Sequence, residues 1–329
     1  MSTTRIITIV CWVVSIIVLS GLAIWFITGT IFGIGGFNMG NGWVSGINID
    51  GIGGFESLSG PYESQGTQTI DSTGLNTIDI NWVAGEITVI PHDGNEIRVT
   101  EFAQRQLRDR ETLTASTSGG TLTIRFRERG NFSRRMPRKN LEVLVPHELS
   151  ESLTRLSVST TSGQVNVNDF EATTLNISSV SASIDVTNIT SQTVNINTTS
   201  GAITATSIRA DKLDASSVSG NFTLTETYAS TLDLSTTSGR TNASGEFDRV
   251  GASTVSGNIN IRSTIAPSRF NSSSVSGDIE LHIPIQETIT VSHSAVSGRF
   301  SSEVPVTMQS GAAYSFSSVS GNTNIYAIG

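Results

Sequence analysis

The sequence is poor in cysteine, proline, aromatic and charged residues. Its 329 residues include one Cys and seven Pro, with 6% aromatic and 15% charged residues. A single cysteine, Cys11, excludes a disulfide framework and a cysteine-based zinc site within one chain. The scarcity of large side chains argues against a thick two-layer core. Ser, Thr, Asn and 31 Gly are abundant instead, and these residues suit pleated strands and tight turns. We therefore expect a thin, repetitive β architecture.

A long apolar run lies near the start of the chain. Residues 6–28 (IITIVCWVVSIIVLSGLAIWFIT) are 23 uncharged, mostly apolar positions, and a helix of that length spans a hydrocarbon core of about 30 Å. The alternative is a cleaved signal peptide with a small-x-small site at Gly21 and Ala23, but the run continues past that site and exceeds an h-region of about 7–15 residues. Arg5 is the only charge before the run. The positive-inside rule then predicts a single-pass protein of the cell membrane, with residues 1–5 cytoplasmic and the C-terminal domain extracytoplasmic.

Glycine dominates the segment that follows this span. Residues 29–60 contain 11 glycines, which is too many for a stable helix. We interpret residues 29–69 as a Gly-rich juxtamembrane linker, with a re-entrant or second membrane segment over residues 31–49 as the alternative. From Thr77 onward apolar residues alternate as in strands, and we assign residues 70–329 to one β domain.

A dipeptide, Ser-Gly or once Ser-Ala, recurs through the second half of the chain. Its last residue falls at Gly163, Ala182, Gly201, Gly220, Gly239, Gly257, Gly277, Gly298 and Gly321, and the first five lie at a constant step of 19 residues. Apolar residues alternate with period two on both sides, so each repeat is two short strands around a corner. A fixed period near 20 residues is typical of a solenoid whose equivalent strands stack about 4.8 Å apart. The sequence predicts an all-β solenoid with these nine residues at its corners.

A third apolar position follows each dipeptide by seven or eight residues and is predicted to close the coil. It is occupied by Phe170, Ile189, Ile208, Tyr228, Phe247 and Ile265.

The repetition also argues against catalysis. Ser219 and Gly220 alone resemble a nucleophile elbow, but the Ser-Gly dipeptide occurs at eight of the corners, and a serine hydrolase needs one serine placed against a histidine and a carboxylate. The four histidines, His92, His147, His282 and His293, lie outside the regular early repeats. Outward-facing charges are expected at Asp185, Asp214, Asp233, Asp278, Arg240 and Arg262. These charges are interpreted as a solvated outer face. The remote alternative is that they belong to a polysaccharide-acting β-helix enzyme. We expect the chain to have no enzymatic activity, no cofactor and no metal site.

Basic residues are concentrated in one part of the chain, although the net charge is −8. Residues 98–139 hold 11 of the 20 basic residues against four acidic ones. The cluster of interest comprises Arg125, Arg127, Arg129, Arg134, Arg135, Arg138 and Lys139. Its functional interpretation is contact with an anionic polymer or lipid head groups. The structural alternative is a solvated hairpin edge whose charge blocks strand aggregation. Nucleic acid is not expected as a partner of an extracytoplasmic domain without interleaved aromatic residues.

Three segments carry a resemblance to a known family: GEITVI at 85–90, LEVLVP at 141–146 and LSVSTTSGQVNV at 156–167 with its later echoes. Over residues 70–329 the chain resembles the β-strand-repeat family called putative adhesin or toastrack (DUF4097), found in LiaG-like membrane-anchored proteins of bacterial envelope-stress loci. The resemblance implies a single-layer right-handed parallel β-helix without established catalytic or cofactor residues. It also implies a role in binding, adhesion or envelope-stress sensing, with the cell wall, an anionic polymer or other envelope-stress membrane proteins as partners.

Two functions therefore compete. The arginine cluster favours a binding protein. Exposed Ser, Thr and Asn ladders with few aromatic residues favour a passive spacer or self-assembling scaffold, because binding sites usually need aromatic or arginine anchors.

Overall fold

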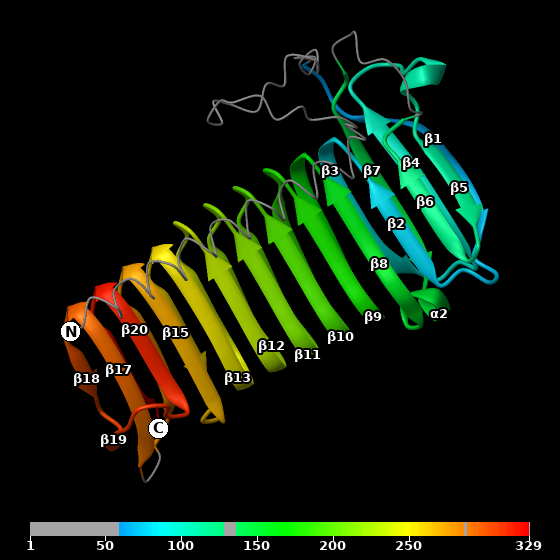
Figure 1. The fold of residues 1–329 in the computed structure, drawn as a ribbon. Coiled ribbons are helices and arrows are strands. Elements are labelled where there is room, and N and C mark those ends of the chain that lie inside the picture. The colour runs from blue at the N-terminus through cyan, green and yellow to red at the C-terminus, as the bar shows by residue number, and fades with distance from the viewer. Residues whose placement is uncertain (1–58, 128–135, 286–287, 329) are drawn as a thin grey trace, which may run out of the picture.

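The computed structural model describes residues 59–127, 136–285 and 288–328. These residues form an elongated, almost entirely β solenoid of about nine turns (Figure 1). The expected membrane span at residues 6–28 lies outside the described ranges. Within them, no helix has both the length and the apolar character needed to cross a bilayer.

The middle of the solenoid is a parallel ladder of long strands. It consists of β8 (Leu153–Thr160), β9 (Ser162–Ser179), β10 (Ser183–Thr198), β11 (Ile203–Ser217), β12 (Phe222–Thr236) and β13 (Thr241–Ser256). Neighbouring strands pair in parallel with equivalent repeat positions opposite each other, as in the column Val165, Ile184, Ile203. These inward side chains are at most 1% exposed. The predicted solenoid of stacked coils is confirmed.

The repeated glycines lie at a corner where backbones approach closely. A Cβ atom on Gly201 would lie 1.7 Å from the carbonyl oxygen of Ala182, and one on Gly220 would lie 1.9 Å from that of Gly201. The hydroxyl oxygens of Thr198 and Ser217, three residues earlier, accept hydrogen bonds from the N–H groups of Gly201 and Gly220 at 3.1 and 2.7 Å. A hydroxyl of the same coil therefore caps these corners, as Ser179 also caps Ala182, and the close approach of the backbones at Gly201 and Gly220 requires glycine.

A second corner bends each long strand. Asp169, Asn188, Ser207 and Glu226 occupy it with φ between 51° and 63°, in the left-handed region that non-glycine residues seldom adopt. Asn188 Nδ2 donates to Asp169 Oδ1 at 2.6 Å, and Ser207 Oγ donates to Glu226 Oε2 at 2.8 Å. Polar bonds between coils thus support a backbone conformation that costs about 1–3 kcal/mol per residue.

The third apolar position closes the coil at four of its six predicted residues. Phe170, Ile189, Ile208 and Phe247 are buried as predicted, but Tyr228 and Ile265 are 39% and 38% exposed. The prediction was wrong for these two residues. β12 keeps the 19-residue step from β11, so Tyr228 lies opposite the exposed Arg209, and Thr227, which is 0% exposed, takes the inward position. The register between β12 and β13 shifts between Leu224 and Thr227, where β12 has one more residue than β13.

The N-terminal end departs from the simple repeat. We call residues 59–127 and 136–152 the N-terminal cap. It contains β1 (Glu63–Asp71), β2 (Thr77–Asn81), β3 (Ala84–His92), β4 (Glu96–Ala103), the 3-10 helix η1 (Asp109–Glu111), β5 (Thr114–Ser118), β6 (Thr121–Arg125), β7 (Lys139–Pro146) and α2 (His147–Ser150).

The stack ends in antiparallel strands at the N-terminal cap (Figure 1). β2 and β3 form a coil that stacks in parallel on β8 and β9, with β6 and β7 on the opposite side. β4 then pairs antiparallel with β7, β1 with β4, and β5 with β6. Gly85 belongs to the corner column although the repeat count missed it, because a Cβ on Gly163 would lie 1.9 Å from the Gly85 carbonyl oxygen.

The C-terminal end comprises short strands. They are β14 (Ile259–Ser263), β15 (Arg269–Ser276), β16 (Ile279–Pro284), β17 (Ile289–Ser297), β18 (Phe300–Ser302), β19 (Val306–Met308), β20 (Tyr314–Ser320) and β21 (Thr323–Ile328).

The last coil in the sequence is not the last in space. β20 lies between β15 and β17, and β21 lies between β16 and β18. Gly321 therefore sits between Gly277 and Gly298 in the corner column. β19 pairs with the start of β17, and the longer final steps of 21 and 23 residues supply the chain for this detour.

Candidate functional site

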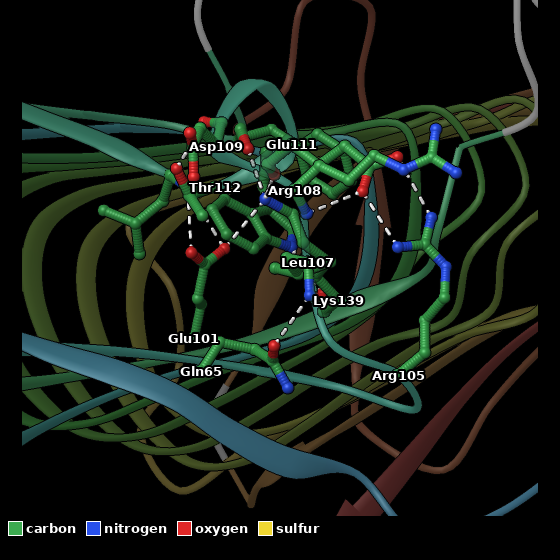
Figure 2. A network of polar contacts seen from close by, with 12 residues as sticks. Gln65, Glu101, Arg105, Leu107, Arg108, Asp109, Glu111, Thr112 and Lys139 are labelled. Carbon is green, nitrogen blue, oxygen red and sulfur yellow. Dashed lines mark hydrogen bonds and ion pairs between the residues drawn. The ribbon is translucent and has the colours of Figure 1, made fainter.

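Lys139, predicted to belong to the surface arginine cluster, is a buried residue of the N-terminal cap. Its side chain is 0% exposed, and Nζ lies 2.8 Å from Glu101 Oε2 (Figure 2). Nζ also donates hydrogen bonds to the carbonyl oxygens of Glu111, at 2.6 Å, and of Phe126. It lies 4.2 Å from the ring centroid of Phe126 and 5.0 Å from that of Trp82. This burial removes Lys139 from any surface that a partner could touch.

The ammonium group is held in a poorly solvated environment. Burial lowers the pKa of Lys139 to about 8, against the opposing effect of the Glu101 carboxylate. Glu101 also accepts the N–H of Leu113 through both carboxylate oxygens, at 3.0 and 3.1 Å. The ion pair is thus closed by hydrogen bonds on both sides, as a buried pair requires.

A second ion pair fixes η1 beside Lys139. Arg105 Nη1 and Nη2 donate to the two carboxylate oxygens of Glu111 at 2.8 and 3.0 Å, and the N–H of Arg108 donates to Glu111 at 2.9 Å (Figure 2). The hydrogen bonds from Arg105 lower the pKa of Glu111 to about 2. Arg105 is therefore committed to the structure of the cap.

Three segments of the chain meet at Lys139, and each of them has arginines close by in the sequence. Glu111, Phe126 and Lys139 itself meet at Nζ, and arginines lie within three residues of each of them in the sequence. We call this group the basic rim; it consists of Arg108, Arg110, Arg125, Arg127 and Arg138. All are exposed except Arg127, which is half-buried. Arg129, Arg134 and Arg135 lie outside the described residues.

The burial of Lys139 has a signal in the sequence. Lys139 precedes Leu141 and Val143 at the same strand parity, and Glu101 follows Ile97 and Val99 in the same way. Both charged residues therefore occupy inward positions on adjacent strands, because β4 and β7 pair antiparallel. A lysine and a glutamate at inward parity on two strands predict a buried ion pair.

The chain enters the N-terminal cap beside η1. Gln104 Nε2 donates to the carbonyl oxygen of Gly60 at 2.8 Å, and the N–H of Leu107 donates to Gln65 Oε1 at 2.9 Å. The start of the described domain is consequently tied to the loop that leads into the basic rim.

A family model described as Toastrack DUF4097 matches residues 75–325. The chain belongs to the toastrack family. The search of curated proteins found no match to this chain.

Solved structures of similar architecture exist. A protein from Parabacteroides distasonis described as a putative lipid binding protein is 15% identical, with 79% of this chain and 96% of that chain covered and a TM-score of 0.52. A putative adhesin from Bacteroides fragilis is 14% identical, with coverage of 78% and 95% and a TM-score of 0.43. At 15% identity, the first of these structures shows that the fold is shared, and it gives no information about activity.

The acidic residues of the toastrack repeat lie on the outside of the coils and are engaged in local contacts. Lys212 Nζ lies 3.4 Å from Asp214 and 3.9 Å from Asp233, while burial and the Asp214 charge raise the pKa of Asp233. Asp185 accepts a hydrogen bond from Gln164, and Asp278 accepts one from the N–H of Asn322.

The histidines of this toastrack chain are dispersed. His92 contacts the backbone of its own hairpin, and His147 lies 3.4 Å from Asp93. His282 stacks on Tyr326, and His293 packs near Phe300. Across the described ranges, no group of three His, Cys, Asp or Glu residues could hold a metal ion. Ser219 Oγ is directed to the Thr199 carbonyl oxygen at 3.5 Å, so Ser219 and Gly220, which alone resemble a nucleophile elbow, belong to a corner of the coil.

Proposed function

We propose that this toastrack chain is a membrane-anchored, extracytoplasmic binding protein whose basic rim contacts anionic lipid head groups of the bacterial envelope. The observation that carries the proposal is the position of Gly60 beside the loop leading into the rim. With residues 6–28 as the anchor, residues 29–58 connect the bilayer to Gly60. A Gly-rich linker of that length has an end-to-end distance of roughly 30 Å, so in this proposal the N-terminal cap is the part of the solenoid nearest the membrane.

The electrostatics favour this contact. Each arginine near an anionic leaflet contributes about 1 kcal/mol, and the attraction falls off over a Debye length of about 8 Å at physiological salt. The rim carries five arginines, and four of them are exposed. The fold relative from P. distasonis carries the description lipid binding, which makes lipid the first surface to test. In this proposal the role is binding or sensing, without an enzymatic reaction.

A passive spacer or scaffold is the second candidate, and one specific observation favours it. A single outward column crosses the stack with almost uniform chemistry: Ser159, Ser178, Asn197, Ser216, Ser235, Ser253, Ser273, Ser317 and Ser294. Such a column of small polar groups offers no aromatic or arginine anchor to a partner.

Cosedimentation with vesicles distinguishes the two functions. Residues 59–329 are mixed with vesicles of phosphatidylglycerol and phosphatidylcholine, with pure phosphatidylcholine, and with isolated cell wall. We expect binding to the anionic vesicles that weakens steeply with salt. The variant Arg108→Gln, Arg125→Gln, Arg138→Gln should lose most of this binding.

The matched control removes the same charge elsewhere. Arg240→Gln, Arg262→Gln, Arg299→Gln changes three exposed arginines on other coils and should bind like the unmodified chain. Rim-dependent binding to wall but not to vesicles would reassign the partner to an anionic polymer. Absence of salt-sensitive binding to all three would leave the spacer. Protease protection in right-side-out cells tests the orientation, because an extracytoplasmic domain must be digested.

A further inference from the structure

A cleft of about 330 Å³ opens beside the second corner of the middle coils. Its walls include Arg209, Asp211, Tyr228, Glu246, Asp248 and Ile265. We call this the corner cleft. It lies on β10, β11, β12, β13 and the loop after β14, and it shares no residue with the basic rim or with the N-terminal cap.

The corner cleft arises where the repeat changes its period. The outward column at this position runs Thr190, Arg209, Tyr228, Glu246. Directly after it runs a column of small residues, Ser191, Ala210 and Ala229. Tyr228 lies in this outward column opposite Arg209, while the adjacent Ala229 stays 5% exposed. A large ring therefore stands beside a floor of small side chains, which is what makes a cleft.

The cleft combines apolar surface with polar groups. Among the described residues five large hydrophobic side chains are exposed, and two of them, Tyr228 and Ile265, line this cleft. The guanidinium carbon of Arg209 lies 4.3 Å from the Tyr228 ring centroid, a cation–π distance that restrains both side chains. Ser191, in the floor, is fixed by a 2.6 Å hydrogen bond from its hydroxyl to the Ala172 carbonyl oxygen.

These groups match a sugar ring better than other ligands. Phosphate and other anions are disfavoured because three carboxylates, of Asp211, Glu246 and Asp248, surround the one arginine of the cleft lining. A purely apolar ligand would leave those carboxylates desolvated, which costs free energy. A saccharide presents C–H faces that pack on aromatic and aliphatic side chains, and hydroxyls that both donate to carboxylates and accept from arginine. A volume near the lower end of the range for small-ligand pockets suits one or two rings.

We propose that the corner cleft is a saccharide-binding site for a neutral or amino sugar. Tyr228 and Ile265 contact the C–H face of the ring, while Arg209, Asp211 and Glu246 hydrogen-bond its hydroxyls. The site goes beyond the lipid contact of the basic rim and does not depend on it. A chain with both sites holds a glycan while its cap faces the membrane.

The test is titration calorimetry of the full chain with defined oligosaccharides. The chain is kept in lauryldimethylamine oxide, because a maltoside detergent would itself supply sugar. The probes are chitotetraose, its N-acetylated form and maltotetraose. We expect saturable binding of at least one probe, with a Tyr228→Ala variant weakened roughly tenfold and a Tyr228→Phe variant close to the unmodified chain, because the ring face makes the contact.

Two controls make the result specific. Tyr326→Ala removes an aromatic ring of another face, one that stacks on His282, and should leave sugar binding unchanged. The triple glutamine variant of the basic rim should do the same. Absence of binding to all three probes overturns the proposal, as does binding that persists in Tyr228→Ala while its unfolding temperature shows an intact fold. Neither result affects the vesicle experiment.

Discussion

The middle of the solenoid and its two ends are stabilised in different ways. From β8 to β13 the same kinds of contact recur: an inward apolar column, a corner formed by glycine or Ala182, and hydroxyl caps on successive corners. The N-terminal end depends instead on a single buried ion pair, Lys139–Glu101, beneath antiparallel strands. The C-terminal end depends on an inserted coil whose Phe316 packs on Phe270, with ring centroids 5.2 Å apart.

The difference shows what repetition can and cannot supply. A repeat buries its apolar residues against the next copy, so the last copy at each end needs a contact that the repeat does not contain. Each end should therefore be sensitive to one residue. The middle should tolerate outward substitutions and fail only where a change blocks the stacking of backbones.

The largest effect is expected from Gly201→Val in the middle. A Cβ at this position would lie 1.7 Å from the Ala182 carbonyl oxygen, and neither backbone can move without disturbing the next coil. We expect a loss of more than about 4 kcal/mol in the free energy of unfolding, or failure to fold. Chemical unfolding followed by circular dichroism measures it. Ala202→Val, at the exposed neighbouring residue, is the control and should be nearly neutral; equal effects would contradict the close-approach argument.

Phe316→Ala tests the C-terminal end. Phe316 is 1% exposed and contacts the rings of Phe270 and Phe300, so its truncation should cost about 3–5 kcal/mol locally. Because coils contact only their neighbours, hydrogen exchange should accelerate in β17, β18, β20 and β21 while β9–β11 stay protected. Uniform acceleration along the chain would show that the end and the middle unfold as one unit.

Lys139→Met tests the N-terminal end. The substitution leaves the Glu101 carboxylate buried beside Trp82 and Phe126, and breaking a buried pair in this way costs about 3–5 kcal/mol. Glu101→Gln in the same chain keeps an acceptor for Leu113 N–H but removes the charge. The double variant should therefore be more stable than Lys139→Met alone. Additive losses in the denaturation midpoints would mean that the two side chains do not interact.

The comparison also explains which parts of the fold the sequence could predict. The constant step of 19 residues and the period-two flanks predicted the middle coils, because there one local rule is repeated. Gly85 was missed since it stands far from the other markers, and the insertion of β20 and β21 had no signal beyond the longer final steps. Pairing between distant coils depends on how the whole chain packs, and a local pattern does not contain it.

The candidate sites show the same limit. The arginine cluster pointed to the right segment, but Lys139 was assigned to the surface because its charge outweighed its inward parity with Leu141. The corner cleft was hidden for the opposite reason. Tyr228 stands one residue beyond the inward position of its coil, which Thr227 occupies, so the expected apolar column misassigned Tyr228 by one residue.

The smallest expected effect is a pH dependence of stability that differs between the two ends. His293 takes an inward position on β17, and burial lowers its pKa. The folded state then binds fewer protons than the unfolded state when the pH falls below the unfolded pKa of about 6.5. Stability of the C-terminal end is therefore full above that pH and is lost progressively as the pH falls toward the lowered folded pKa.

Lys139 responds at the alkaline end of the pH scale. Its pKa is lowered to about 8 from 10.5, so the unfolded state binds more protons between these values, and the N-terminal end should gain stability as the pH rises through that window. Hydrogen exchange of β17 and of β7 can be followed across both windows. His293→Phe should abolish only the acid response, and Lys139→Met only the alkaline one. A variant that abolished both would show that the ends are coupled through the middle, against the nearest-neighbour picture of the stack.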